Sequence, residues 1–293
     1  MKNDEIRELL SAVYGEPVRI ESAVSVGGGC INETRVLTLS NGQKAFLKYH
    51  PAPPSGFFKA EARGLTLLGQ VKNGPRAPKV LALQPGRRAH YLLLEYVEER
   101  SPGKEFYVRF GETLAELHRT SGDAYGLDHD NFIGKTPQSN AREKDPAVFY
   151  RERRIRFQQE LARKSGLLPK SLDLKLDRLC GRLAEWIAPP GEKPALLHGD
   201  LWSGNYFADA GQRPFVFDPA VYYGLREADL AMTELFGRLP QAFYDAYRGT
   251  FPLAPGYDER KQLFNLYHLL NHLNLFGRSY LSSVERTVDY FVR

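Results

Sequence analysis

The stretch that decides the fold of this chain reads HGDLWSGN at residues 198–205, and the run FVFD follows it at residues 215–218. Asp200 and Asn205 are separated by four residues, and Asp218 ends the apolar run, which is typical of a strand. Asp, Ser, Gly and Asn also form ordinary turns, for backbone reasons. Turn formation explains each of these residues taken alone. It does not explain why two carboxylates and one amide occur together in this order.

These groups in this order suit phosphoryl transfer. The reaction depends on positioning and on cations that offset developing charge more than on a covalent nucleophile. In a kinase catalytic loop with the spacing Asp-x-x-x-x-Asn, the Asp accepts a proton from the substrate hydroxyl and the Asn holds Mg²⁺. The spacing therefore predicts Asp200 as the catalytic residue, Asn205 and Asp218 as metal ligands, and ATP and Mg²⁺ as cofactors.

A glycine-rich segment in the N-terminal third meets a requirement of this hypothesis. Residues 24–32 read VSVGGGCIN, and Gly27, Gly28 and Gly29 could bring backbone N–H groups close to phosphates. Three glycines more often mark a plain loop or bulge, so the motif is a weak indication by itself. Cys30 lies in the same segment, where a positive environment would favour the reactive thiolate; a redox-sensitive activity and a plain packing role are both open.

Five strand-like runs are expected in the N-terminal third. One leads into the glycine-rich segment, and the others lie at 34–39, 44–49, 79–83 and 91–96. Asn41-Gly42 stands between the second and third runs and is the strongest short-range hairpin signal. The pattern predicts a five-stranded antiparallel sheet with a hairpin at this turn.

Two charged residues and a short segment of this region fit nucleotide binding. Lys48 falls on the third run, and a helical pattern over 57–68 carries Glu61, so we expect the two side chains to pair as in kinases. An exposed strand lysine is the alternative for Lys48. The segment after the last strand is expected to join two lobes and offer backbone groups to adenine, with a plain linker as the alternative; its residues are Glu95, Tyr96 and Val97.

The expected fold class is α+β, with the two-lobe architecture of protein kinases. We expect residues 1–97 to form a nucleotide-binding lobe with a five-stranded antiparallel sheet and one helix. We expect residues 98–293 to form a larger, mainly helical lobe for catalysis and acceptor binding. Its clearest helical patterns cover 106–119, 145–164, 172–187 and 257–277, and Pro146 suits a first turn.

Composition narrows the partners and the compartment. The net charge is +5 and the pI about 9.0, but the charges are spread, so no nucleic-acid partner is expected. The one dense basic run, at 151–156, is expected to be a solvated helix face. No apolar stretch approaches a membrane span, which predicts no membrane partner and a cytoplasmic location. Cys30 and Cys180 are too few for a disulfide framework.

Several longer runs make the chain resemble the fructosamine kinase (ketosamine-3-kinase) family, within the protein-kinase-like, aminoglycoside-phosphotransferase-like superfamily. The similarity extends through nearly the whole chain. The runs that carry it are GGGCIN at 27–32, DNFIG at 130–134 with TPQ at 136–138, HGDLWSGN at 198–205, DPAVYYG at 218–224, READLAMTELFG at 226–237 and YHLLNHLN at 267–274.

This resemblance implies an ATP-dependent kinase that phosphorylates the 3-hydroxyl of a ketosamine, a sugar joined through its first carbon to an amine such as a protein lysine. The 3-phosphate is unstable, so the adduct falls off and the amine is deglycated. Asp229 is implied to support the catalytic loop. Trp202 is expected to stack on the acceptor, with a buried structural role as the alternative. Other residues that could line the acceptor site, with a core or supporting position as the alternative for each, are Tyr222, Tyr223, Glu234 and His272.

Two further functions stay open at this point. A relative in the same superfamily could phosphorylate an aminoglycoside, choline or another amino alcohol. A nucleotide-binding pseudokinase scaffold is the third hypothesis, and the presence of Lys48, Asp200, Asn205 and Asp218 together argues against it. The motifs leave open the preferred sugar (fructose, ribulose or erythrulose), the choice between free and protein-bound acceptors, and the oligomeric state.

Overall fold

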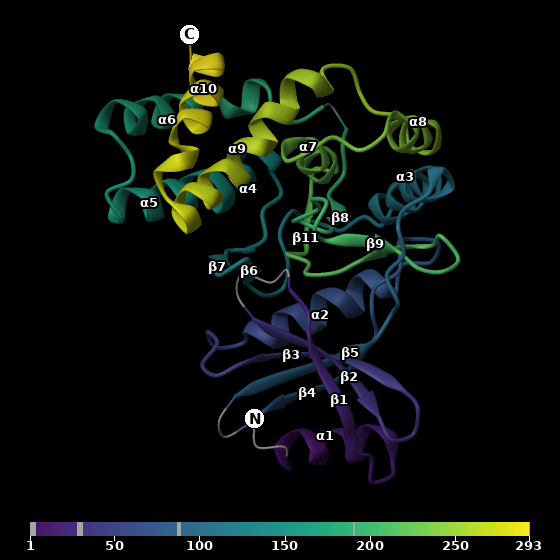
Figure 1. Ribbon diagram of the computed structural model, residues 1–293. Coiled ribbons are helices and arrows are strands. Elements are labelled where there is room, and N and C mark those ends of the chain that lie inside the picture. The colour runs from purple at the N-terminus through teal and green to yellow at the C-terminus, as the bar shows by residue number, and fades with distance from the viewer. Residues whose placement is uncertain (1–3, 28–31, 87–88, 190, 293) are drawn as a thin grey trace.

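The computed structural model describes residues 4–27, 32–86, 89–189 and 191–292, and these form two lobes (Figure 1). The smaller lobe is built on a five-stranded antiparallel sheet, and the remainder is mainly helical. The predicted fold class is therefore confirmed. The exact lobe boundary, predicted after residue 97, stays a prediction.

The sheet of the small lobe has the strand order β1-β2-β3-β5-β4, so only β4 and β5 depart from chain order. The predicted hairpin between β2 and β3 is present, because Gly42 has a φ of 79° and the Asn41 side chain accepts a hydrogen bond from the Gln43 N–H at 3.1 Å. The strands are β1 (Ile20–Ser25), β2 (Glu33–Leu39), β3 (Lys44–His50), β4 (Val80–Pro85) and β5 (His90–Glu95).

Two helices cover the two faces of this sheet. Helix α2 (Phe57–Gly69) lies on the face toward the large lobe, and α1 (Asp4–Tyr14) lies on the opposite face (Figure 1). Successive side chains of a strand point to opposite faces. Leu92 and Leu94 of β5 accordingly pack in the cluster with α2, and Leu93 packs in the cluster with α1. The most buried strand of the lobe is thus enclosed on both sides.

The prediction of a single helix in this lobe was wrong, because it omitted α1. The first residues are strongly charged, and that charge masked a helical apolar stripe formed by Ile6, Leu9 and Leu10. All three side chains are buried against the sheet. The stripe of one short amphipathic helix was the signal that could have revealed it.

The large lobe contains most of the helices and three short two-stranded ladders (Figure 1). Within the described residues, no helix has the length and apolar character needed to cross a membrane. The helices are α3 (Lys104–His118), α4 (Pro146–Tyr150), α5 (Arg156–Lys164), α6 (Lys170–Arg182), α7 (Glu227–Leu235), α8 (Gln241–Thr250), α9 (Tyr257–Phe276) and α10 (Leu281–Val292). The ladders pair β6 (Asn131–Ile133) with β7 (Thr136–Gln138), β8 (Ala195–Leu197) with β11 (Tyr222–Gly224), and β9 (Tyr206–Ala208) with β10 (Pro214–Val216).

The helix predicted at 145–164 is interrupted. Asp145 caps its start by accepting hydrogen bonds from two backbone N–H groups at 2.7 and 3.0 Å, and Pro146 occupies the first turn as predicted. A π-helical turn then covers Arg151–Ile155 before α5 begins. A π turn adds a residue and changes the face on which the following side chains lie. The expectation of a fully solvated basic run is wrong for Arg154, whose side chain is completely buried.

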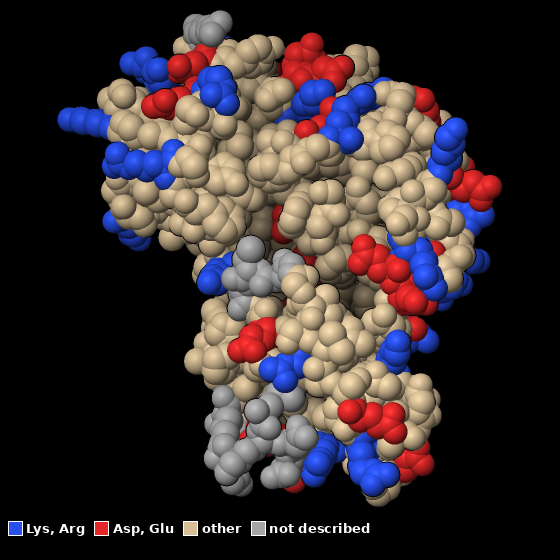
Figure 2. All heavy atoms as spheres, viewed as in Figure 1, with Lys and Arg blue, Asp and Glu red and all other residues tan. Residues whose placement is uncertain are grey.

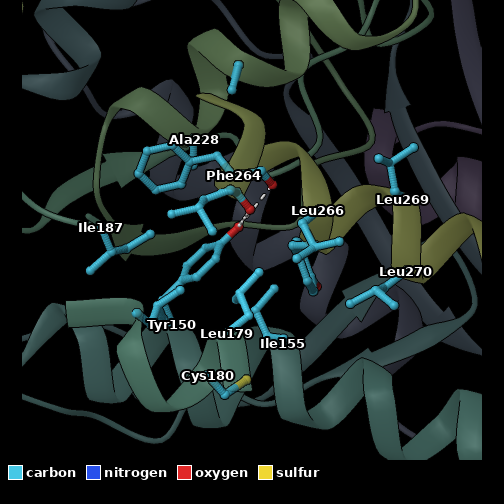
Figure 3. Packing of buried hydrophobic residues seen from close by; sticks show 14 of the residues in the cluster. Tyr150, Ile155, Leu179, Cys180, Ile187, Ala228, Phe264, Leu266, Leu269 and Leu270 are labelled. Atoms are coloured by element: carbon cyan, nitrogen blue, oxygen red, sulfur yellow. Dashed lines mark hydrogen bonds between the residues drawn. The ribbon is translucent and has the colours of Figure 1, made fainter. Parts of the chain in front are cut away.

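The core of the large lobe lies where α4, α5 and α6 meet α7 and α9 (Figure 3). The Tyr150 hydroxyl donates to the carbonyl oxygens of Leu263 and Phe264 at 3.1 and 2.9 Å, which ties α4 to α9. Cys180 is buried in the same cluster, and this burial raises the pKa of its thiol to about 11. The helix predicted at 172–187 ends earlier, at Arg182, and a short 3₁₀ turn follows it.

Helices α3 and α8 approach so closely that Gly111 has no room for a side chain. An added Cβ would lie 2.2 Å from the Phe243 carbonyl oxygen and 2.9 Å from the Tyr247 backbone nitrogen. We expect Gly111→Ala to lower the free energy of unfolding by about 1–3 kcal/mol, because the two helices must separate. Gly249→Ala on α8 is the matched control: it meets no atom within 4 Å and should raise that free energy by about 0.5–1 kcal/mol. Denaturant titration measures both, and equal effects would contradict the close approach.

Candidate active site

The loop that carries Asp200 is held in place by Asp229 of α7. The two carboxylate oxygens of Asp229 accept hydrogen bonds from the backbone N–H groups of His198 at 2.7 Å and Gly199 at 2.9 Å. A third contact joins Asp229 to the His118 ring at 3.2 Å. Burial alone would raise the pKa of Asp229, but these hydrogen bonds and the two imidazoles hold it below its ordinary value. Asp229 therefore stays a carboxylate and keeps the loop backbone fixed.

This loop also touches the segment that follows Asp218. Gly199 has a φ of 84°, and an added Cβ would lie 2.1 Å from the Ala220 carbonyl oxygen, so only glycine fits. The His198 carbonyl accepts a hydrogen bond from the Ala220 N–H at 2.9 Å. On the other side, the His198 ring bonds the Phe217 carbonyl oxygen at 2.9 Å. These contacts fix the position of Asp200 relative to Asp218.

Asp200 lies in an environment that favours its protonated form. The Asn205 side chain donates to the Asp200 carbonyl oxygen at 2.8 Å and to its carboxylate at 3.3 Å. Burial, with the charge of Asp218 adding to it, raises the pKa of Asp200 to about 7. A carboxylate with a pKa close to the operating pH is suited to accept a proton from a substrate.

Lys48 connects the two lobes. Its Nζ, on β3, lies 2.5 Å from Glu61 Oε1 of α2 and also forms an ion pair with Asp218 of the large lobe. Its side chain is only 4% exposed. Burial alone would lower the pKa of Lys48, but the carboxylates of Asp218 and Glu61 raise it above its ordinary value. The expected contact between Lys48 and Glu61 is present, and the link to Asp218 is an addition that the sequence did not predict.

Asn205 and Asp218 form an oxygen donor set that suits Mg²⁺. The Asn205 amide nitrogen is engaged with Asp200, which leaves its carbonyl oxygen for another ligand. Asp218 has a φ of 53°, uncommon for a residue with a side chain, and its carboxylate is 41% exposed. Mg²⁺ is usually bound by one or two protein oxygens together with water and phosphate oxygens. The two residues fit a magnesium ion that is shared with a nucleotide.

A cavity of about 620 Å³ lies between the lobes, and Figure 2 shows the surface hollowed there. It is lined by the sheet and α2, by the loop of Asp200, and by the C-terminal end of α9. Its size is within the range of small-molecule sites. The predicted site residues that line it are Gly27, Lys48, Glu61, Glu95, Tyr96, Val97, Asp200, Trp202, Asn205, Asp218 and His272.

Three residues predicted in the phosphate loop, Gly28, Gly29 and Cys30, lie outside the described residues. The redox role of Cys30 therefore stays a prediction. Gly27 and Asn32, which flank them, both line the cavity.

Tyr222 and Glu234 are not among the residues that line the cavity, so their role at the acceptor site stays a prediction. Tyr222 is 3% exposed and packs under the Arg154 guanidinium. The Arg154 Cζ lies 4.0 Å from the centre of the Tyr222 ring. Glu234 accepts a hydrogen bond from the Tyr257 hydroxyl at 2.8 Å and pairs with Lys261 at 3.0 Å. The resemblance to the family suggested them, but it does not determine the direction of a side chain.

A buried amide network beside Asp218 was missed by the sequence interpretation. Asn131 and Gln138 of the β6–β7 hairpin donate to the carbonyl oxygens three and two residues after Asp218, at 2.7 and 3.0 Å. Arg154 donates to Asn140, which donates to Asn131, each at 2.9 Å. The runs DNFIG and TPQ were noticed for their resemblance only. Their polar residues could have been assigned to this support role only with the topology in hand.

The chain is similar to known proteins over nearly its whole length. The family model described as "Fructosamine kinase" matches residues 2–293. "Probable ketoamine kinase" of Synechocystis is 39% identical over 297 residues, covering 98% of this chain and 96% of the relative. The chloroplastic protein-ribulosamine 3-kinase of Arabidopsis thaliana is 35% identical and covers 100% of this chain and 89% of the relative.

Solved structures agree with the sequence relatives. A crystal structure described as "Putative fructosamine-3-kinase" from Haemophilus somnus has a TM-score of 0.88 at 30% identity and covers 98% of this chain and 97% of the other. An ADP-bound aminoglycoside phosphotransferase has a TM-score of 0.56 at 15% identity, covering 98% and 97% of the two chains. The second likeness is one of fold alone.

The raised pKa of Asp200 predicts a stability penalty that depends on pH. The ordinary carboxyl pKa is near 3.8, and the pKa of Asp200 in the folded protein is about 7. Between these two pH values the unfolded state loses a proton that the folded state retains. The free energy of unfolding therefore falls as the pH rises. Asn carries no such charge. We expect metal-free Asp200→Asn to be more stable than the parent at pH 8, by about 1–3 kcal/mol, and the difference to narrow toward pH 5. Melting temperatures across this range measure it, and a difference independent of pH would contradict the assignment.

Proposed function

The chain belongs to the fructosamine kinase family, and we propose that its cavity transfers the γ-phosphoryl group of ATP to the 3-hydroxyl of a ketosamine. The observation that carries the proposal is the meeting of Lys48, Asp200 and Asp218 in one cavity between the lobes. The acceptors that we propose are free ketosamines and the same adducts on protein lysines. Phosphorylation at the 3-position yields an unstable product, so the reaction would lead to deglycation.

The small lobe is assigned to the nucleotide. Residues 95–97 line the cavity where the sheet ends, and their backbone groups can bond adenine. The Lys48 ammonium contacts the phosphates, and Glu61 holds that ammonium in place. Mg²⁺, held by Asn205 and Asp218, would neutralise phosphate charge and align the transferred group. Gly27 lies at the edge of the loop that would cover the phosphates.

The loop of the large lobe is assigned to the acceptor. Asp200 orients the hydroxyl and accepts its proton as the hydroxyl oxygen bonds to the γ-phosphorus and the bond from that phosphorus to the departing ADP breaks. The raised pKa of Asp200 matches that task. Trp202 is 38% exposed and lines the cavity, which supports stacking on the sugar over a buried structural role. An added Cβ on Gly204 would lie 2.3 Å from the indole, so glycine at this position leaves the ring its space.

The alternative functions have less support. The likeness to an aminoglycoside phosphotransferase is one of fold alone, at 15% identity, whereas the probable ketoamine kinase of Synechocystis is 39% identical over 98% of this chain. A pseudokinase scaffold would not need the ion pairs of Lys48 or a raised pKa at Asp200, and both are present. No observation favours either alternative.

A panel of acceptors tests the proposal. We expect ATP consumption, measured by a coupled assay, with ketosamines of fructose, ribulose or erythrulose, and NMR of the products should place phosphate on the 3-oxygen. Asp200→Asn should bind ATP and lose turnover by about 10²–10⁴, the usual contribution of a positioned base. Turnover with choline or an aminoglycoside but with no ketosamine would overturn the proposal, as would near-native turnover by Asp200→Asn.

A further inference from the structure

Four aromatic rings gather where α9 leaves the cavity, and we call them the aromatic rim: Phe236, His272, Phe276 and Tyr280. His272 is central, with ring centres 4.7 Å from Phe236, 5.3 Å from Phe276 and 5.0 Å from Tyr280. His272 and Phe276 stand one helical turn apart on α9 and both line the cavity. Phe236, which follows the end of α7, does not itself line the cavity but contacts His272, which does.

The rim is more exposed than packing alone would require. Phe276 is 54% exposed and Phe236 is 38% exposed. Phe276 and Trp202, which is 38% exposed, both line the cavity, and together with Phe236 they account for three of the nine large hydrophobic side chains that are exposed in the described part of the chain. Single exposed apolar residues are normal, but an apolar group gathered at a cavity marks a binding surface.

We propose that the aromatic rim binds the hydrocarbon chain of the amine that carries the ketosamine, and so selects adducts of long aliphatic amines such as the lysine side chain. This inference rests on the proposed function. The sugar of a ketosamine is polar, and its reacting hydroxyl must reach Asp200. The amine substituent is attached at the first carbon and continues away from the sugar. In a lysine adduct the four carbon atoms that follow the amine nitrogen are methylenes, which aromatic faces bind well.

The cavity lining is continuous with this surface. The cavity is lined by Asp200 and Trp202 and also by three residues of α9, which are His272, Leu275 and Phe276. The lining therefore includes a carboxylate, aromatic rings and an aliphatic side chain. The His272 Nδ1 is bonded to the His268 carbonyl oxygen at 2.8 Å, which fixes the ring. Burial lowers the pKa of His272, so near neutral pH the ring is uncharged and does not repel the ammonium of a substrate amine.

A chain-length series tests the inference. The acceptors are ketosamines of one sugar with methyl, propyl and pentyl amines, and kcat/KM is measured for each. A fully buried methylene contributes about fourfold in affinity, so one half covered on the open rim contributes about twofold. We expect the pentyl adduct to exceed the methyl adduct by about tenfold, and Phe236→Ala and Phe276→Ala each to reduce this ratio to about threefold or less.

Tyr290→Ala is the matched control, because Tyr290 is 55% exposed on α10 and its ring contacts Phe291, which is not part of the aromatic rim. It should keep the parent ratio. Equal kcat/KM for the three adducts, or an unchanged ratio in both Phe variants, would overturn the inference and leave the proposed function intact. Loss of self-association in Phe276→Ala with an unchanged ratio would assign the rim to a second copy of this chain and overturn it as well. Failure of all three adducts to react would instead refute the proposed function.

Discussion

The ion pairs of Lys48 are the interaction on which the rest of this structure depends. A buried ammonium from β3 meets Glu61 of α2 and Asp218 of the large lobe. Removing a charge from water is costly, and the cost is offset only when the partners are close and well placed. Loss of Lys48 would leave the buried Glu61 carboxylate without its compensating charge. The relative position of the two lobes is therefore tied to the three groups that the proposed reaction uses.

The β6–β7 hairpin packs against the elements that carry Glu61 and Asp218. Its Phe132 packs against Phe57 of α2 at 5.0 Å between ring centres, next to the helix turn that carries Glu61. Its Asn131 and Gln138 hold the segment after Asp218 through carbonyl hydrogen bonds. One hairpin thus contacts both α2 and the segment after Asp218. On the other side, Asp229 fixes the loop of Asp200, so Asp200 and Asp218 are held by separate contacts that meet at His198.

Local patterns predicted much of this arrangement. Asn41-Gly42 marked the hairpin that places Lys48, and the spacing of Asp200, Asn205 and Asp218 suggested the site because the chemistry needs these groups in order. Side-chain direction was not predictable. Tyr222 lies two residues from Ala220 yet faces Arg154, and Arg154 is buried because a π turn shifts the helical phase, which a regular 3.6-residue period does not reveal. Helix α1 was overlooked because charge obscured its apolar stripe.

The most direct test of the central role of Lys48 is a double-mutant cycle on kcat/KM for ATP with a ketosamine acceptor. It compares the parent, Lys48→Met, Glu61→Gln and the double variant. If Glu61 acts only by holding Lys48, the double variant should be no worse than Lys48→Met, which we expect to lose about 10²–10³, the cost of removing one electrostatic group. Losses that multiply in the double variant would show that the two residues act independently and would contradict this account.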